Sequence, residues 1–339
     1  MSRADLARMS GLTPATVSAL VAELDDEGLV QDVGTRRVDA QVGKPPTMLA
    51  IRTAARDVVA LDLSDPTTMR AAVSDLSGAL VSQIQMPVDG ADGLDAVERV
   101  KVLLHRALER TTAPILGIGV GTPGVVSPDG NVLEASNFGW HDLALRSELE
   151  AEFGLAVHVS NDANAAAVAE YTRGGHECSN LAVVTIGTGV GAGFVLSGQS
   201  YLGEHAGAGE IGHLVVDADG PECRCGHRGC LETFVSLPNI ARTVKSDVDG
   251  ADAARRTAAG RLGIALAAIV AILDIDHVLL SGPRQILGDD FCEHATDELR
   301  NRCLAATARS VSVRYSTLGD DAVLLGMASL VLSQELGVT

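Results

Sequence analysis

Four potential metal ligands fall within one short stretch of the chain, residues 209–232, which reads GEIGHLVVDADGPECRCGHRGCLE. They follow the pattern H-x9-C-x-C-x4-C and are His213, Cys223, Cys225 and Cys230. Three thiolates and one imidazole suit tetrahedral Zn²⁺, and four protein ligands leave no position for a catalytic water. Thiolates also favour zinc over Mg²⁺ or Ca²⁺. The spacing therefore predicts a structural zinc ion around which this segment folds back on itself.

The same cysteines have a simpler interpretation, as redox-active or merely buried thiols. The chain has six cysteines, and the three outside the cluster are scattered, at positions 178, 292 and 303. This is not the dense spacing of a disulfide scaffold, and it fits a reducing cytoplasm. A compact set in a cysteine-poor chain favours the metal site.

Composition indicates a soluble α/β protein of two or three domains. The 339 residues are 46% hydrophobic, with 36 glycines and 3% aromatic residues. The formal net charge of −18 disfavours broad non-specific nucleic-acid binding but is compatible with one small DNA-reading module. The longest apolar run, Gly263–Leu273, is too short for a membrane span, which needs ~20 residues. No secretory signal opens the sequence. We expect a cytoplasmic protein that makes no membrane contact.

The first residues of the chain predict two short helices joined by a tight turn. Ser2 can cap the first helix, with Asp5 as its capping-box partner. Gly11 supplies the positive φ that a tight turn requires. Thr13 can cap the second helix, with Pro14 at its first position.

The second helix and the residues after it complete the pattern of a winged helix-turn-helix domain over residues 1–54. Strands are expected at Leu29–Val33 and Thr47–Ile51, around a basic loop. The inner face of the second helix is predicted at 3/4 spacing by Val17, Leu20, Val21 and Leu24. The candidate DNA contacts are Thr13, Thr16, Ser18, Arg36 and Arg37. A small helical cap with no DNA role is the alternative, because residues 1–52 hold six Lys/Arg against seven Asp/Glu.

A strand–helix pattern then occurs twice, which predicts a two-lobed α/β body with a cleft between the lobes. In the first copy, strands near 58–63, 69–74 and 79–84 precede a helix near 93–110 and a strand at 115–120. In the second copy, strands at 182–186 and 191–196 precede helices from about residue 237. A closing helix is expected over 320–336.

Three further motifs are ambiguous on their own. Asp162, in SNDANAAAVAE, is either a helix N-cap or a general base at the end of a strand, and the cap is the commoner case. The turn GTGVGAG (187–193) can expose backbone N–H groups to a phosphate or merely close a hairpin. Trp140, the only tryptophan, is expected in the core rather than against a sugar.

Together these segments resemble the ROK family (repressor, open reading frame, kinase) over nearly the whole chain. The matching motifs are GKPPTML (43–49), GIGVGTPGVV (117–126), NFGW (137–140), NDANAAAVAE (161–170), TIGTGVGAGFVL (185–196) and GEIGH…CRCGHRGCLE (209–232). The resemblance implies an actin-like, RNase H-type two-lobed α/β body, preceded by a winged helix-turn-helix in the regulators. The first lobe would comprise residues 55–166 plus 318–339, and the second, with the zinc loop, 167–317. Related regulators have a further helix before SRADLARMSGL, which is expected to be missing here.

The resemblance also implies a sugar site. The residues that would contact sugar hydroxyls are Asn137, Asn161, Asp162, Glu210, His213 and Glu232. Asp162 would be the catalytic base if the chain were a kinase, and the phosphate loop would comprise Gly187, Thr188 and Gly189. His213 would bind zinc through one ring nitrogen and face the sugar with the other. Zinc would thus hold Glu210 and Glu232 in place around a polyol.

The loop after the first strand of the body separates the two branches of the family. Kinases of the family carry Asp-x-Gly-Gly-Thr there, whereas this chain reads ALDLSDPTTM (60–69). Ser64 and Asp65 replace both glycines, and Pro66 removes a backbone donor. Asp65 would also place a negative charge beside the phosphate. Kinase activity is therefore not expected.

These observations favour a sugar-responsive transcriptional regulator, most simply a repressor. Its partners would be a DNA operator and a monosaccharide or sugar phosphate that changes lobe closure in a homodimer or homotetramer. An ATP-dependent sugar kinase with an altered phosphate loop is the alternative. A sugar-binding module without either activity is the third possibility.

Overall fold

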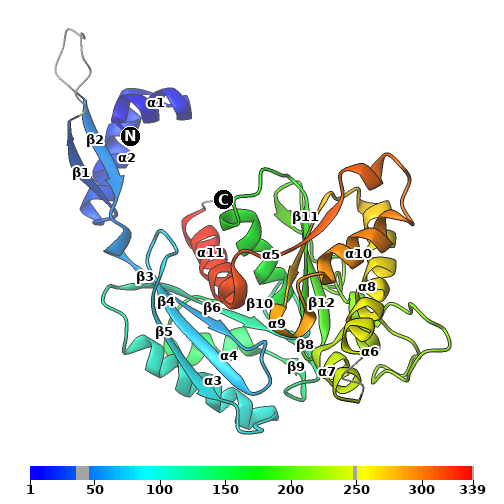
Figure 1. Ribbon diagram of the computed structural model, residues 1–339. Helices are drawn as coiled ribbons and strands as arrows, with labels where there is room; N and C mark the ends of the chain where they lie inside the picture. The colour runs from blue at the N-terminus through cyan, green and yellow to red at the C-terminus, as the bar shows by residue number, and fades with distance from the viewer. Residues whose placement is uncertain (36–45, 247–249, 338–339) are drawn as a thin grey trace.

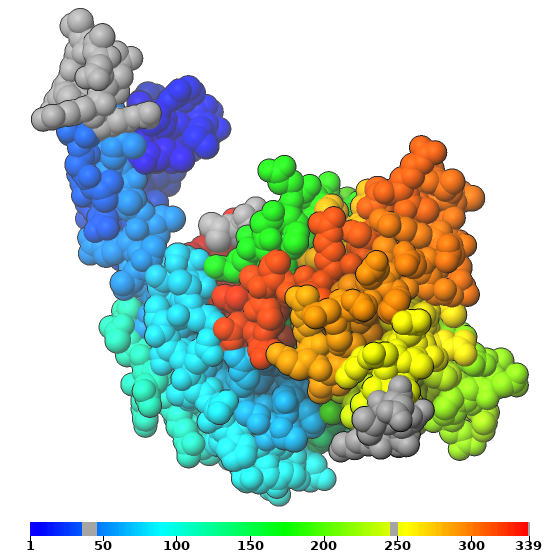
Figure 2. Space-filling view, viewed as in Figure 1, coloured from blue at the N-terminus to red at the C-terminus, as the bar shows by residue number. Residues whose placement is uncertain are grey.

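The computed structural model describes residues 1–35, 46–246 and 250–337. The helices and strands at the start of the chain form a small N-terminal domain, which stands clear of the body (Figures 1 and 2). It comprises α1 (Arg3–Ser10), α2 (Pro14–Asp26), β1 (Val30–Thr35) and β2 (Thr47–Ile51), followed by the 3₁₀ turn η1 (Thr53–Ala55). The two strands pair antiparallel. Both predicted helices and both predicted strands are confirmed.

The caps of the N-terminal helices are those that the sequence predicts. Ser2 and Asp5 form the reciprocal capping box of α1, and Gly11 ends that helix with a φ of 71°. The Thr13 side chain accepts the backbone N–H of Thr16, and Pro14 opens α2.

The predicted inner face of α2 is partly wrong. Val17 and Val21 are buried against Leu49, but the side chains of Leu20 and Leu24 are 44% and 39% exposed. Within the described residues, one short helix and a two-stranded hairpin cover α2, so its buried stripe is a single i, i+4 row.

The first lobe is built on a five-stranded sheet in the order β10-β6-β3-β4-β5. The three strands β3, β4 and β5 are antiparallel neighbours, while β6 and β10 run parallel to β3. Helices α3 (Gly93–Leu108) and α4 (Leu145–Phe153) belong to this lobe, together with a small sheet of β7 (Val125–Val126), β8 (Val132–Ala135) and β9 (Trp140–Leu143). The main strands are β3 (Asp57–Asp62), β4 (Thr68–Ser74), β5 (Leu80–Pro87), β6 (Ile115–Thr122) and β10 (Val157–Asn161).

The second lobe repeats this topology. Its sheet has the order β13-β12-β11-β14-β15, with β11, β12 and β13 antiparallel and β14 and β15 parallel to β11. The predicted duplication of the α/β body is therefore confirmed. The strands are β11 (Leu181–Ile186), β12 (Val190–Leu196), β13 (Gln199–Ser200), β14 (His277–Ser281) and β15 (Ser312–Tyr315). The helices are α6 (Glu232–Val235), α7 (Leu237–Ser246), α8 (Ala251–Leu273), α9 (Arg284–Leu287) and α10 (Phe291–Arg300).

Helix α8 is the one helix of the described residues that is long and apolar enough to cross a membrane. One of its faces carries Leu262, Leu266 and Val270 into the core of the second lobe, against α10. The apolar run Gly263–Leu273 thus contributes a core face, as its length predicts, although Ile272 on the opposite side is 80% exposed.

Two helices join the lobes (Figure 1). They are α5 (Asp162–Arg173) and α11 (Ala322–Leu336), and they share one hydrophobic core with β3 of the first sheet and β11 of the second. Small residues let them approach closely: a Cβ on Gly326 of α11 would lie 1.9 Å from the Ala165 carbonyl oxygen of α5. Helix α5 begins with Asp162, so this packing also sets the position of that carboxylate.

We expect Gly326→Ala to lower the free energy of unfolding by about 1–3 kcal/mol, because the added methyl group overpacks the contact between α5 and α11. Gly260→Ala in α8 is the matched control, since a Cβ there meets nothing within 4 Å. The control should be neutral or stabilising by up to ~1 kcal/mol. Chemical denaturation measures both, and equal effects would contradict this account of the helix contact.

Candidate functional site

The four predicted metal ligands come together in the second lobe. The ligand atoms of His213, Cys223, Cys225 and Cys230 all lie within 4.8 Å of one another. The His213 Nδ1 atom is 3.6 Å from the Cys223 sulfur, and the Cys225 and Cys230 sulfurs are also 3.6 Å apart. A tetrahedron with ~2.3 Å metal–sulfur bonds has edges of ~3.8 Å. The cluster therefore has the donor types and spacing to hold one metal ion.

Turns of the backbone build this cluster. The Cys223 N–H donates to the His227 carbonyl at 2.8 Å, and the Gly226 N–H donates to the Cys223 carbonyl at 3.0 Å. Gly226 has a φ of 88°, which a residue with a side chain rarely adopts. The pKa of the Cys225 thiol is lowered to about 6, chiefly because the backbone N–H of His227 donates to it. A thiolate is the form that binds a metal.

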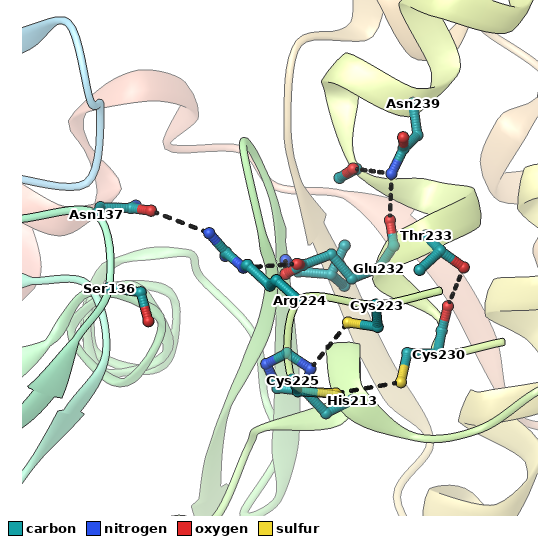
Figure 3. Close-up of polar contacts among 12 residues, drawn as sticks. Ser136, Asn137, His213, Cys223, Arg224, Cys225, Cys230, Glu232, Thr233 and Asn239 are labelled. Atoms are coloured by element: carbon teal, nitrogen blue, oxygen red, sulfur yellow. Dashed lines mark hydrogen bonds and ion pairs between the residues drawn. The ribbon is translucent and has the colours of Figure 1, made fainter. Parts of the chain in front are cut away.

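Glu232 follows the last ligand of the cluster by two residues and begins α6. It is only 8% exposed. Its Oε2 atom accepts the Val190 backbone N–H at 3.3 Å, and its Oε1 atom lies 3.2 Å from the Arg224 Nε atom (Figure 3). The carboxylate is thus held between the β11–β12 turn and the segment that carries the four predicted metal ligands. We call this segment, residues 213–232, the metal loop.

Arg224 connects the metal loop with the first lobe. It lies between two metal ligands in the sequence, and its guanidinium reaches the Asn137 side-chain oxygen at 3.5 Å (Figure 3). Asn137 lies in the turn between β8 and β9. Two of the predicted sugar residues, Asn137 and Glu232, therefore meet the same side chain from opposite lobes. The sequence offered one signal for Arg224, a cation within CRC, but not its partners.

The remaining carboxylates of the predicted site influence one another. The pKa of Asp162 is raised from 3.8 to about 7, first by burial and then by the negative charges of Asp62 and Glu210. Burial also raises the pKa of Glu210, and the charge of Glu232 adds to this effect while His213 opposes it. The predicted carboxylates from both lobes are thus close enough to interact.

The N-cap of α5 is Asn161, so the prediction that Asp162 caps this helix is wrong. The Asn161 side-chain oxygen accepts the Asn164 N–H at 3.1 Å, and its amide donates to the Gly124 carbonyl at 2.9 Å. The helix begins one residue earlier than expected, which places Asp162 at its first position. Asp162 is therefore not the N-cap, although its Oδ1 atom accepts the Ala163 N–H at 2.8 Å.

The loop after β3 satisfies its own backbone donors. The Ser64 N–H and hydroxyl both donate to Asp62, at 2.9 and 2.6 Å. The Thr67 and Thr68 N–H groups donate to the Asp65 carboxylate, at 2.7 and 3.2 Å. These backbone N–H groups are thus already paired with carboxylates of this chain.

The predicted phosphate loop in the second lobe is a tight turn between β11 and β12. The Gly187 N–H donates to the Gly189 carbonyl at 2.9 Å, which closes the turn. A Cβ on Gly189 would lie 2.9 Å from the Glu232 carboxylate. Glycine at 189 therefore lets the backbone approach Glu232. A tight hairpin turn accounts for this glycine without a phosphate. Thr188 lies between the two glycines and is half-buried.

The predicted DNA contacts on α2 are exposed. Thr13 and Thr16 share a hydrogen bond at the start of the helix, and the Ser18 hydroxyl donates to the Pro14 carbonyl at 2.8 Å. The other two predicted contacts, Arg36 and Arg37, lie outside the described residues. Trp140 is buried, as predicted, and stacks on Phe138 with ring centres 4.7 Å apart.

The sequence of the body decides its family, since residues 59–334 match the ROK family. The chain belongs to the ROK family. It is 28% identical over 373 residues to the xylose repressor of Caldicellulosiruptor bescii, which covers 99% of this chain and 92% of that protein. It is also 32% identical over 307 residues to a glucokinase of Halalkalibacterium halodurans, covering 79% of this chain and 93% of the glucokinase.

A solved structure shares the architecture of the whole ROK chain. It is a ROK family transcriptional regulator, a homologue of the Escherichia coli MLC protein, and matches with a TM-score of 0.85 at 24% identity. The match covers 99% of this chain and 92% of that one. The ROK body therefore has the expected actin-like, two-lobed α/β fold of the sugar kinases.

We expect Asp162→Asn to remove a pH dependence of stability. The folded protein binds the Asp162 proton more tightly than the unfolded chain, with a pKa of about 7 against 3.8. The stability from that protonated carboxyl is therefore present below pH 3.8 and lost as the pH rises through about 7. Asp162→Asn should lose less free energy of unfolding than the parent between pH 5 and 8.

Asp129→Asn, at an exposed turn, is the control and should follow the parent at every pH. Denaturant titrations at four or five pH values measure all three proteins. Parallel curves for the parent and Asp162→Asn would contradict the burial of this carboxylate.

Proposed function

We propose that this ROK protein is a sugar-responsive transcriptional repressor. One observation carries the proposal: an N-terminal two-helix and hairpin domain precedes a body in which backbone N–H groups of the loop after β3 are bound by the loop's own carboxylates. The name of the xylose repressor, which matches this chain from end to end, supports the same function. Repression would change because the sugar binds two arrangements of the lobes with unequal affinity.

The effector would lie between the lobes, at the predicted sugar residues. Carboxylate and amide oxygens accept hydrogen bonds from sugar hydroxyls, and several of them converge here. The contacts would come from Asn137, Asn161, Asp162, Glu210, His213 and Glu232. The names of two relatives, a xylose repressor and a glucokinase, support a pentose or hexose such as xylose or glucose.

Zinc is the metal that the cluster suits best, because three thiolates and one imidazole are its usual structural ligands. His213, Cys223, Cys225 and Cys230 would hold it, leaving no coordination position for water. The nearer ring nitrogen to Cys223 is Nδ1, so Nε2 remains for a hydrogen bond to the sugar. The ion would thus fix the loop that carries Glu232 rather than react.

The N-terminal domain would read DNA through the exposed start of α2, as a winged helix-turn-helix. Thr13, Thr16 and Ser18 would contact the operator there, and Arg36 and Arg37 would contact its backbone from the predicted wing. Two such domains in a homodimer or homotetramer would match two half-sites. This function requires a cytoplasmic location, which the scattered free thiols also favour.

The alternative function, sugar phosphorylation, has one specific observation in its favour. The pKa of Asp162 is raised to about 7, which suits a general base near neutral pH. A coupled assay with ATP and a panel of hexoses tests it. Turnover that Asp162→Asn abolishes would establish a kinase and overturn the choice made here.

The repressor function is tested by gel-shift titration with DNA upstream of the protein's own gene, at low salt. A specific shift that xylose or glucose weakens would support it. If the protein binds one of these sugars but gives no specific shift, the repressor function is refuted. The remaining interpretation is then a sugar-binding module.

We expect Glu232→Gln to weaken sugar binding by about tenfold or more, because hydrogen bonds to a charged group contribute about 1.5–3 kcal/mol. Glu222→Gln is the control on the same loop, since its side chain is 81% exposed and pairs with Arg228. Ligand-induced thermal shifts measure both variants. Equal shifts in parent and Glu232→Gln would remove Glu232 from the sugar site.

We expect Cys225→Ser to lose the bound zinc and to lower the free energy of unfolding by ~4 kcal/mol, before any sugar is added. Cys178→Ser, at a half-buried thiol outside the cluster, should retain zinc and cost ~1 kcal/mol. Elemental analysis and denaturation measure the two effects. Retention of zinc by Cys225→Ser would contradict the four-ligand site.

A further inference from the structure

Arg224 occupies the place where the two lobes present their predicted sugar residues. Its guanidinium lies 3.2 Å from the Glu232 carboxylate of the second lobe and 3.5 Å from the Asn137 side-chain oxygen of the first (Figure 3). Glu232 is nearly buried, whereas the Arg224 side chain is 51% exposed. One partner is therefore fixed, while the other can move into solvent.

The Arg224 guanidinium contacts two acceptors, on Glu232 and Asn137, that would otherwise be available to sugar hydroxyls. A buried carboxylate is costly without a positive or hydrogen-bonding partner, and Arg224 supplies both to Glu232. Sugar hydroxyls can supply the hydrogen bonds instead, without the charge. The guanidinium and an uncharged polyol are thus alternative partners for the same oxygens.

The charges around Arg224 also bear on the class of ligand. Carboxylates lie near this region: burial raises the pKa of Asp162 and of Glu210, and neighbouring negative charge raises each of them further. Arg70, another arginine near these acids, pairs with Asp62 and Asp321. A phosphorylated sugar would add negative charge here. Its phosphate could pair with Arg224, but that ion pair would take Arg224 away from the Glu232 carboxylate.

We propose that Arg224 is a specificity residue that occupies the sugar site of the unliganded protein and is displaced from Glu232 and Asn137 by an uncharged monosaccharide. This inference rests on the proposed sugar-binding function. Ligand binding then breaks a bridge between the lobes, and the displaced side chain moves towards solvent. The effector is an uncharged monosaccharide rather than a sugar phosphate.

The test compares Arg224→Met with Arg228→Met. Both arginines lie on the metal loop and pair with a glutamate, but Arg228 pairs with the exposed Glu222 at 2.8 Å. Arg224→Met should bind xylose or glucose about two- to fivefold more tightly, because the sugar no longer displaces an ion pair. Arg228→Met should keep the parent affinity, and Arg224→Lys should fall between the two. Titration calorimetry measures each, with zinc content as the check of folding.

Salt gives a second measurement on the same proteins. Raising the salt concentration screens the half-exposed ion pair, so the sugar affinity of the parent should rise with salt. The affinity of Arg224→Met should not change with salt. Weaker binding by Arg224→Met, or a preference of the parent for glucose 6-phosphate over glucose, would overturn the proposal and make Arg224 a direct ligand contact.

A double-mutant cycle separates this inference from the sugar-binding function. Arg224→Met and Glu232→Gln, singly and together, should show a coupling of about 1.4- to 5-fold in the unfolding equilibrium constant of the sugar-free protein. No coupling would overturn the role of Arg224 whether or not a sugar binds. Coupling without binding of any tested sugar would instead refute the proposed sugar-binding function.

Discussion

The convergence of His213, Cys223, Cys225 and Cys230 on one point is the constraint on which the rest of the site depends. A loop of this length without regular structure would lose much conformational entropy on ordering, and a bound ion would offset that cost. The geometry of the cluster fixes the residues between and beside the ligands. Arg224 is thereby directed at the first lobe, and Glu232 is buried beneath the β11–β12 turn. The metal loop therefore positions the side chains that it contributes to the proposed binding surface.

The duplicated fold supplies the opposite side of this surface. Each lobe has the same strand order, and α5 and α11 pack between the two sheets through alanine and glycine. Because α5 follows β10 directly, Asp162 lies at a strand end, close enough to Asp62 at the end of β3, two strands along the sheet, for their charges to interact. These two carboxylates of the proposed site thus lie at strand ends, and the sheet topology brings those strand ends together. Their mutual repulsion and burial keep Asp162 partly protonated near neutral pH.

Local sequence signals predicted much of this structure, and non-local contacts account for what they missed. The Ser2 capping box and the Gly11 turn are encoded by neighbours in the sequence, and both are confirmed. The four predicted metal ligands are also close in sequence, and the structure brings their side chains together. Leu20 and Leu24 follow a helical period, but their exposure depends on how little protein lies opposite.

Asn161 rather than Asp162 caps α5. Asn and Asp are about equally favoured as N-caps, so the sequence alone does not decide between these two adjacent residues. The role of Arg224 depends on Asn137, which is distant in sequence, so no motif could reveal it. The sequence shows Ser64 and Asp65 in the loop after β3, but it does not show that Asp62 and Asp65 accept hydrogen bonds from the backbone N–H groups of that loop.

The central claim is that the metal organises the sugar site without taking part in binding. The most direct measurement is the dissociation constant of the effector sugar, determined by calorimetry on zinc-loaded protein, on chelator-treated protein and after zinc is restored. The account predicts that binding is lost with the metal and returns with it, because Glu232 loses its position when the loop is released. An unchanged dissociation constant in the metal-free protein would contradict the account.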